Sequence, residues 1–266
     1  RDVLAAHARR QGHDRITLGR TGLVVSRLAQ GTGTHGFGGS SNQLRQLGVE
    51  GLADLLYAGY DEGLTLWDCA DSYGSHAAAA RALRFVKRHR VVLLTKSQAT
   101  GEAEMTADLD RFRRELDTDV IDIVLLHGVA DADWPTRKAG AMAALSRARE
   151  RGQVRAVGVS CHSLEALQAS AATPWVEVQL ARFNALGAHM DAPPDVVGPI
   201  LQEMRAAGRG VLGMKILAQG DLRDHVDDAL RHALHSDALD GFTIGCESRL
   251  ELRDLLRRIP AAAKNA

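Results

Sequence analysis

The sequence predicts an α/β protein, a (β/α)8 TIM barrel with an N-terminal β-hairpin. Short apolar runs rich in valine, isoleucine and leucine recur eight times, and helical patterns with apolar positions three and four apart lie between them. Strands that are buried on both faces read as continuous apolar runs, and the alternation of strand and helix implies parallel crossovers. Eight such units in about 250 residues fit a closed barrel.

The expected elements follow in order along the chain. Residues 15–26 are expected to form the hairpin, to turn at Arg20-Thr21-Gly22 and to plug the bottom of the barrel. The strands are expected at RLAQGT (27–32), LTLWDCA (64–70), VVLLTKS (91–97), IDIVLLHG (121–128), VRAVGVSC (154–161), WVEVQLAR (175–182), GVLGMKI (210–216) and DGFTIGC (240–246). Helical patterns such as EMTADLDRFRRELD and VVGPILQEMRAAG separate them. We expect residues 1–266 to form a single domain, with an N-terminal extension over 1–13 and the barrel over 27–259.

The stretch GTGTHG (31–36) matches the G-x-G-x-x-G pattern of a Rossmann turn and raises an alternative, the open doubly wound sheet. That turn needs a helix that opens on the last glycine. Here the residues that follow are FGGSSNQ, which cannot start a helix at Gly36. The stretch is therefore expected to be a loop at the mouth of a barrel.

The composition excludes several classes of protein. The 266 residues are 45% hydrophobic and 25% charged, and 33 basic residues balance 33 acidic ones. Without a long run of one sign, nothing indicates a nucleic acid or an anionic membrane as a partner. No apolar run approaches the ~18 residues of a membrane span.

The cysteines indicate a reducing compartment. Cys69, Cys161 and Cys246 show no C-x-x-C pair and no zinc spacing, so neither a disulfide framework nor a metal site is expected. We expect a cytoplasmic protein, and Arg9-Arg10 lacks the apolar segment that follows a twin-arginine export signal. Because the sequence begins with Arg1, removal of an export signal stays open.

Polar residues stand at the ends of consecutive strands. In such barrels the chemistry lies at the C-terminal ends of the strands, and alternation from the apolar interior positions turns Asp68, Lys96 and His127 inward. Tyr73 follows Asp68 by five residues. Neighbouring strands lie about 4.8 Å apart, so these groups are expected to be within mutual reach.

This set of four residues resembles the catalytic tetrad of the aldo-keto reductases. The resemblance runs in order along nearly the whole chain, through LGRTGLVVSRLAQGTGTHG, DCADSYG, LLTKS, LLHG, RAVGVS, VEVQLARFN and TIGCES. It implies NAD(P)H-dependent reduction of a small aldehyde or ketone to an alcohol, or the reverse. The implied catalytic residues are Asp68, Tyr73, Lys96 and His127.

The resemblance also implies a role for each of the four. Tyr73 would donate a proton to the carbonyl oxygen. A lysine ammonium about 4 Å away favours the phenolate by roughly 4 kcal/mol at an effective dielectric constant near 20, so Lys96 is expected to lower the pKa of Tyr73 by about three units. Asp68 would keep Lys96 charged, and a neutral His127 would hydrogen-bond the carbonyl oxygen.

Cofactor contacts are implied at several loops. Ser160 and Gln179 would hold the nicotinamide carboxamide, and the full expected set is Gly33, Thr34, His35, Asp68, Ser160, Cys161, Gln179, Met214, Lys215, Gly245, Cys246, Ser248 and Arg249. Cys161 stands where the family usually has asparagine, and Met214 where it often has a tyrosine that stacks on the nicotinamide. The family favours NADP(H), whereas Glu247 and Glu251 near the expected 2′-phosphate site favour NAD(H), and the sequence leaves both open.

The substrate pocket is expected to be lined by Phe37, Tyr73, His127 and Trp134. The segment IPAAAKNA after the last expected helix is shorter than the specificity loop of many family members, which predicts an open pocket. The substrate and the oligomeric state stay unassigned.

Other functions remain as alternatives. A lyase could form a Schiff base at Lys96, although the nearby Asp68 favours the non-nucleophilic ammonium. A non-catalytic NAD(P)H-sensing subunit would keep the cofactor site. A hydrolase with His35, His127 and His162 as metal ligands would lack the H-x-H pair and the acidic ligands that such sites need.

Overall fold

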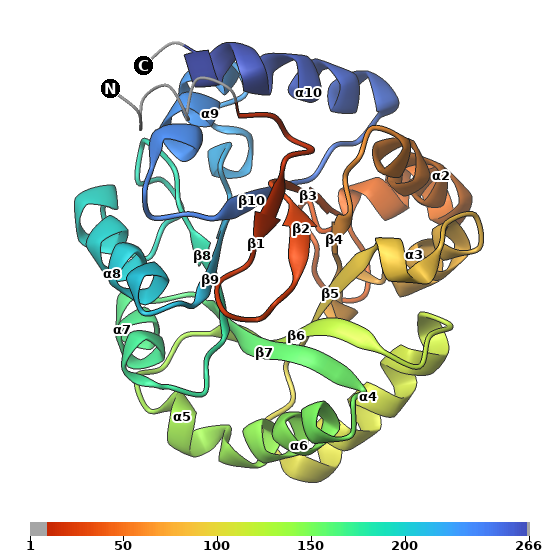
Figure 1. Cartoon of the computed structure of the whole chain (residues 1–266), viewed down its shortest axis with the longest axis vertical. Coiled ribbons are helices and arrows are strands. Elements are labelled where there is room, and N and C mark those ends of the chain that lie inside the picture. Colours follow the sequence, from red (N-terminus) through yellow and green to blue (C-terminus); the bar gives the residue numbers. More distant parts are fainter. Residues whose placement is uncertain (1–9, 265–266) are drawn as a thin grey trace.

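The computed structural model describes residues 10–264. Eight parallel strands close into a barrel in the order β10-β3-β4-β5-β6-β7-β8-β9, and helices surround it (Figure 1). The strands are β3 (Leu28–Gly31), β4 (Leu66–Asp68), β5 (Val92–Ser97), β6 (Ile121–Val129), β7 (Val154–Cys161), β8 (Val178–Arg182), β9 (Gly210–Met214) and β10 (Gly241–Ile244). The predicted (β/α)8 fold is confirmed. Most of the expected N-terminal extension lies outside the described residues.

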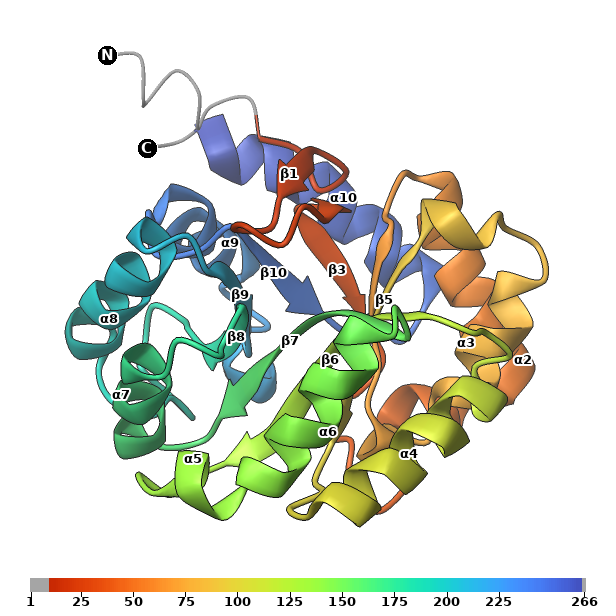
Figure 2. The same cartoon turned by 60° about the horizontal axis from the view of Figure 1, so that its bottom comes forward.

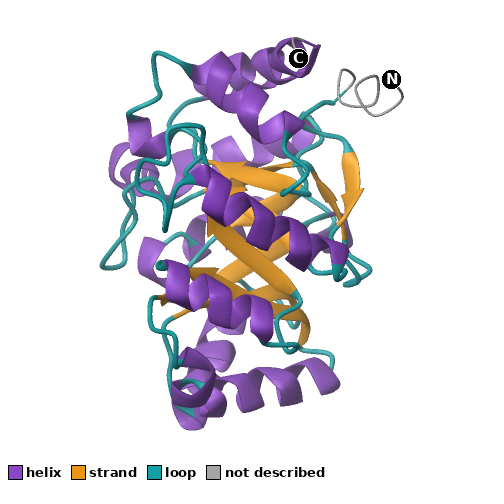
Figure 3. Ribbon diagram, turned by 90° about the vertical axis from the view of Figure 1, so that its left-hand side faces the viewer, coloured by secondary structure: helices purple, strands orange, loops and turns teal. Residues whose placement is uncertain are grey.

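The helices form the outer layer around the strands (Figure 3). They are α2 (Asn42–Asp61), α3 (His76–Leu83), α4 (Glu102–Glu115), α5 (Trp134–Arg137), α6 (Ala139–Glu150), α7 (Leu164–Ala172), α8 (Pro194–Ala206), α9 (Val226–His235) and α10 (Arg249–Lys264), with short 3-10 turns η1 (Asp71–Tyr73), η2 (Arg88–Arg90) and η3 (Ala218–Gly220). Across the described part of the chain, no helix combines the length and apolar character needed to cross a membrane.

Strand alternation divides the core into two layers. Inside the barrel, Leu66, Leu94, Ile123 and Leu180 belong to one apolar cluster, whereas Trp67 and other outward-facing residues pack under the helices in a second. Side chains alternate between the two faces of a strand with a period of two residues. Asp68 and Lys96 therefore lie on the inner face, because each comes two residues after an inner leucine, Leu66 or Leu94.

The hairpin closes the lower end of the barrel. β1 (Arg15–Thr17) and β2 (Val24–Ser26) pair antiparallel and lie across the N-terminal ends of the strands (Figure 2). Leu18, Leu23 and Val25 are at most 1% exposed and join the inner cluster. Each buried side chain of this kind stabilises the fold by about 1.5–3 kcal/mol. The expected plug is therefore observed.

The last helix is longer than expected. α10 continues to Lys264, so most of the segment interpreted as a tail is helical, and Pro260 lies within it. Ile259, Ala262 and Ala263 are buried, and their packing holds the final turns on the barrel. The last helix therefore continues to Lys264, past the expected end of the barrel at residue 259, and the tail gives no argument for an open pocket.

Candidate active site

Three strand ends and one turn meet at the C-terminal mouth of the barrel. Asp68 ends β4, Lys96 lies near the end of β5, and His127 lies near the end of β6. These strands are consecutive neighbours, with Asp68 paired to Leu94 and Lys96 paired to Leu125 in register. Tyr73 comes from η1, which begins three residues after β4. The four residues of the expected tetrad lie together.

Lys96 connects three groups at the centre of this site. Its side chain is fully buried, and its ammonium donates to an Asp68 carboxylate oxygen, to the carbonyl of Cys69 at 2.9 Å and to the hydroxyl of Tyr73 at 3.4 Å. Burial is the largest single effect and lowers the pKa of Lys96, but the charges and hydrogen bonds of Asp68 and Tyr73 together outweigh it and leave the pKa above its ordinary value. Lys96 is therefore an ammonium with all three hydrogens used.

The pKa of Tyr73 differs from the sequence-based expectation. Burial raises the pKa of its hydroxyl, and this effect exceeds the opposing attraction of Lys96. The charge of Asp68 also raises it. The expected lowering was wrong because it counted the lysine and neither the loss of water nor the second charge. Tyr73 is a protonated phenol in this structure.

His127 is a neutral imidazole beside the tyrosine. Burial, followed by the charge of Lys96, lowers the pKa of His127 to about 3. Its ring packs edge-on against Tyr73 with centroids 5.6 Å apart, and its Nδ1 lies 3.4 Å from the hydroxyl of Ser72. His162 lies 6.3 Å away by ring centroid, and burial lowers its pKa to about 4. A neutral imidazole can donate one hydrogen bond without bringing a charge.

The glycines of the GTGTHG loop make room for the tyrosine. A Cβ at Gly33 would lie 2.5 Å from Cζ and 2.6 Å from Cδ2 of Tyr73, and a Cβ at Gly36 would lie 2.5 Å from Cδ1. All three distances are shorter than real Cβ contacts. Gly33 was expected to contact the cofactor, but the space that a side chain would occupy at Gly33 and at Gly36 is filled by the ring of Tyr73. The other two expected cofactor contacts of this loop are Thr34, which hydrogen-bonds Gln43, and His35, which is exposed.

Two expected cofactor contacts face away from the mouth. Gln179 is fully buried, but its Oε1 accepts from Ser170 of α7 at 2.5 Å, and the Cys161 sulfur lies 3.9 Å from the same oxygen. The reason is strand alternation. Val178 and Leu180 face the barrel interior, so Gln179 between them faces the helices. Cys161 belongs to the outer apolar cluster in the same way.

Ser160 does face the interior, and Arg182 is a polar neighbour that sequence reasoning missed. Ser160 is fully buried, and its hydroxyl has no hydrogen-bond partner among residues 10–264. Arg182 lies two residues beyond the inner residue Leu180 and pairs with Asp191 at 2.9 Å. Alternation along β8 was the signal for Arg182.

The end of β9 joins this part of the mouth. Met214 pairs with Arg182 in register and belongs to the inner cluster. Lys215 follows it in a left-handed backbone conformation, with φ of 56°. Burial, then repulsion from Arg182, lowers the pKa of Lys215. Ser160, Arg182, Met214 and Lys215 therefore form one side of the mouth.

The loop after β10 is tied to its surroundings. Glu247 accepts hydrogen bonds from Asn42 at 3.0 Å and Gln46 at 2.7 Å on α2. Glu251 accepts from the Glu247 backbone N–H at 2.7 Å at the start of α10. Gly245 packs against Thr34, and Cys246 is buried. The hydroxyl of Ser248 accepts from the backbone N–H of Glu251. The guanidinium of Arg249 lies 3.4 Å from the carbonyl of Asp54. Both carboxylates thus have internal partners.

The two aromatic pocket residues differ in position. Phe37 is 79% exposed in the loop after β3. Trp134 is 1% exposed, and its indole N–H donates to the carbonyl of Ala166 on α7 at 3.2 Å. Trp134, the first residue of α5, therefore packs against α7 in the outer cluster, and its burial there keeps it from lining the mouth.

Comparisons with known proteins identify the family of this chain. The model of the aldo/keto reductase family matches residues 31–264. This chain belongs to the aldo/keto reductase family. An aldo-keto reductase of Mycobacterium marinum (strain ATCC BAA-535 / M) is 33% identical over 127 residues, 43% of each chain. The aldo-keto reductase YhdN of Bacillus subtilis (strain 168) is 26% identical over 166 residues, 56% of this chain and 47% of that protein. The part of this chain that matches covers less than half of the length of either relative.

Solved aldo-keto reductase structures share the fold. A chain from Pseudomonas aeruginosa described as an aldo-keto reductase superposes with a TM-score of 0.77 at 24% identity, over 96% of this chain and 98% of that one. An aldo-keto reductase from Klebsiella pneumoniae, solved in complex with NADPH, superposes with a TM-score of 0.70 at 21% identity, over 94% of this chain and 89% of that one.

Proposed function

We propose that this chain is a nicotinamide-dependent oxidoreductase that reduces an aldehyde or ketone to an alcohol, or catalyses the reverse reaction. One observation carries the proposal. A single buried ammonium, Lys96, bonds Asp68 and lies 3.4 Å from the Tyr73 hydroxyl, beside a neutral histidine at the mouth of the barrel. This arrangement can give a proton to a substrate oxygen and stabilise the negative charge that remains.

Each of the four residues would have a different role at the substrate carbonyl. Bound NAD(P)H would supply the hydride to the carbonyl carbon. Tyr73, protonated in this structure, would donate its proton to the oxygen, and the Lys96 ammonium would stabilise the phenolate left behind. His127 would donate a hydrogen bond to the same oxygen and so orient the carbonyl. Asp68 would hold Lys96 charged and in place.

The side of the mouth between β7 and β9 fits a nicotinamide. The unpartnered, buried hydroxyl of Ser160 is available to a polar ligand group, and the thioether of Met214 can pack on a ring face. We propose that Ser160 and Met214 contact the nicotinamide and that Lys215 contacts a phosphate of the cofactor. Gln179 takes no part, because Ser170 already binds its amide oxygen.

NADP(H) is the proposed cofactor. The case for NAD(H) depended on Glu247 and Glu251 accepting hydrogen bonds from a ribose hydroxyl, and both carboxylates already accept hydrogen bonds from the chain. The NADPH complex of the Klebsiella pneumoniae structure supports the same choice. Arg249 is the cation in this loop and the proposed partner of the 2′-phosphate.

The Schiff-base lyase is less consistent with the site. A lysine nucleophile needs a lowered pKa, whereas Asp68 and Tyr73 together raise that of Lys96 above its ordinary value. All three ammonium hydrogens also have acceptors within the chain. A sensing subunit would bind the cofactor without turning over a substrate, so turnover is the measurement that separates it from a reductase.

The proposal is tested by titrating the purified protein with NADPH and, separately, NADH, followed by fluorescence. Tighter binding of NADPH and its oxidation on addition of benzaldehyde are the expected results. Arg249→Met should weaken NADPH binding and leave NADH binding unchanged. Absence of binding for both nucleotides would overturn the cofactor proposal, and binding without oxidation of NADPH by any aldehyde or ketone tried would favour a sensing role.

A further inference from the structure

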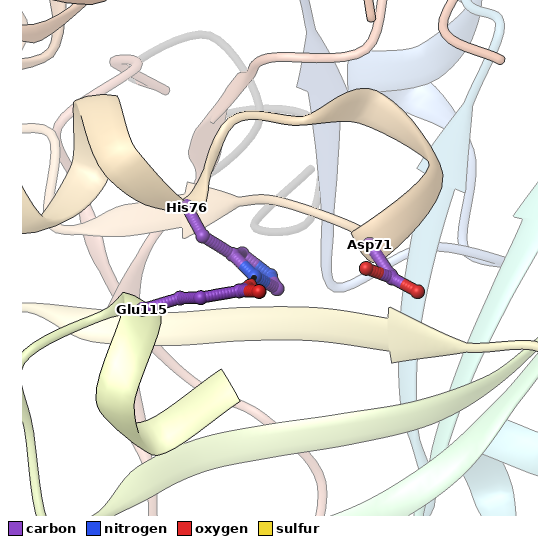
Figure 4. A group of neighbouring side chains, drawn as sticks. All are labelled: Asp71, His76 and Glu115. Atoms are coloured by element: carbon purple, nitrogen blue, oxygen red, sulfur yellow. Dashed lines mark hydrogen bonds and ion pairs between the residues drawn. The ribbon is translucent and has the colours of Figure 1, made fainter. Parts of the chain in front are cut away.

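A second polar cluster lies beneath the turn that carries Tyr73. Asp71, His76 and Glu115 place their ligating atoms within 4.8 Å of one another (Figure 4). They come from three elements, because Asp71 begins η1, His76 begins α3 and Glu115 ends α4. Such a group can hold a metal ion, but the contacts of its members give it a different role.

An arginine already supplies the positive charge in this cluster. Arg111 of α4 grips Asp71 with two parallel hydrogen bonds, at 2.7 Å to one carboxylate oxygen and 2.9 Å to the other. The same guanidinium donates to Asp108 at 2.8 Å and to Glu115 at 3.1 Å. These hydrogen bonds, that to Asp71 foremost, raise the pKa of Arg111 above its ordinary value. Paired, forked hydrogen bonds of this kind fix orientation as well as distance.

Both ring nitrogens of His76 also have partners within the chain. Its Nδ1 lies 2.7 Å from the second carboxylate oxygen of Glu115, and its Nε2 lies 2.7 Å from the hydroxyl of Thr95. Burial lowers the pKa of His76, so a neutral ring donates from Nδ1 to Glu115 and accepts from Thr95 at Nε2. With both nitrogens bonded inside the chain, His76 has no lone pair to offer a metal ion.

The cluster joins the two catalytic elements through one helix. Asp71 lies two residues before Tyr73 and His76 three residues after it, so α4 holds the tyrosine turn on both sides. The helix also reaches β5 on both sides of Lys96, through His76 to Thr95 and through Asp108, which accepts from Ser97 at 2.6 Å. The position of Tyr73 relative to Lys96 therefore depends on α4.

We propose that Arg111 is a positioning residue that holds the η1 turn so that the Tyr73 hydroxyl stays within reach of the Lys96 ammonium. The inference rests on the proposed function for its effect on turnover, but its effect on the turn is independent of any activity. A displacement of about 1 Å at a reacting group can cost on the order of 100-fold in rate. Loss of the forked bond should therefore lower kcat by about 10- to 100-fold, with KM and the NADPH dissociation constant changed by less than about twofold.

The experiment compares Arg111→Met and Arg111→Lys with a matched control, Arg113→Met. Arg113 lies on the same helix but bonds the carbonyl of Asp119 at 2.9 Å and pairs with Asp110 and Asp119, away from η1. Hydrogen exchange should show lost protection over residues 71–76 in Arg111→Met and wild-type protection in Arg113→Met. Unchanged exchange in Arg111→Met would overturn the proposal whether or not the protein reduces carbonyls.

Turnover of benzaldehyde with saturating NADPH gives the second readout. Arg111→Lys, which keeps the charge but not the fork, should recover part of the kcat lost in Arg111→Met. In a Tyr73→Phe background, Arg111→Met should cause no further loss, because Arg111 acts through that hydroxyl. An equal loss in both backgrounds, or a wild-type kcat for Arg111→Met, would overturn the proposal. A wild type that turns over no carbonyl contradicts the proposed function, and the exchange result then decides the role of Arg111.

Discussion

Gly33→Ala tests whether the GTGTHG loop positions the tyrosine. The added Cβ would lie closest to Cε2 of Tyr73 and 2.5 Å from Cζ, whereas ordinary van der Waals contact begins at 3.4 Å, so the ring must move by at least about 0.9 Å. The hydroxyl already lies 3.4 Å from the Lys96 ammonium, and movement of this size away from it breaks their hydrogen bond. A displacement of about 1 Å at a reacting group corresponds to a loss on the order of 100-fold in kcat.

The assay is steady-state NADPH oxidation with benzaldehyde, together with the NADPH dissociation constant from fluorescence. Gly33→Ala should lose kcat by about 100-fold and keep its NADPH affinity within a few fold. Gly198→Ala is the matched control, because a Cβ there meets only Phe183, at 3.8 Å, within α8. It should keep wild-type turnover and gain about 0.5–1 kcal/mol of stability. A wild-type kcat for Gly33→Ala would refute the reasoning, and a loss confined to NADPH affinity would mean that the loop serves the cofactor and not the tyrosine.

Two further predictions concern stability. Trp134→Ala should lower the free energy of unfolding by about 3–5 kcal/mol in urea titrations, because it leaves a cavity under α7. It should leave KM unchanged. A raised KM at unchanged stability would mean that Trp134 lines the substrate pocket. In the folded chain the pKa of His127 is about 3 and that of His162 about 4, both below the ordinary 6.5. Between these pH values the unfolded chain binds more protons than the folded chain. The free energy of unfolding should therefore fall as the pH falls from about 6.5 towards 4. His162→Gln should show a smaller loss of Tm over that range, and an unchanged loss of Tm at low pH would contradict the lowered pKa of His162.

The fold was predictable because it follows from local patterns. Apolar runs and helical spacing along the chain gave eight strands and their order, and the closed barrel confirms them. The convergence of Asp68, Lys96 and His127 followed from one further rule, the alternation of side chains along a strand. The length of α10 was missed because burial of Ile259 and Ala263, a tertiary effect, extends a helix past the point where its sequence suggested an end.

The errors at the site arose where residues were assigned from a family motif and not from the alternation of side chains along a strand. Gln179 was assigned from its likeness to a family segment, although it alternates with the inner residues Val178 and Leu180 and must face outward. Arg182 was missed for the same reason. The pKa of Tyr73 depended on how much water the fold removes from its hydroxyl, which no sequence pattern reports.

The role of Tyr73 as proton donor is the central claim, and Tyr73→Phe tests it most directly. The variant removes the hydroxyl that lies 3.4 Å from Lys96 and keeps the ring against Gly33 and Gly36. With NADPH bound and benzaldehyde saturating, its kcat should fall by about two to four orders of magnitude while its NADPH dissociation constant stays at the wild-type value. A kcat within a few fold of wild type would contradict the assignment of proton donation to Tyr73.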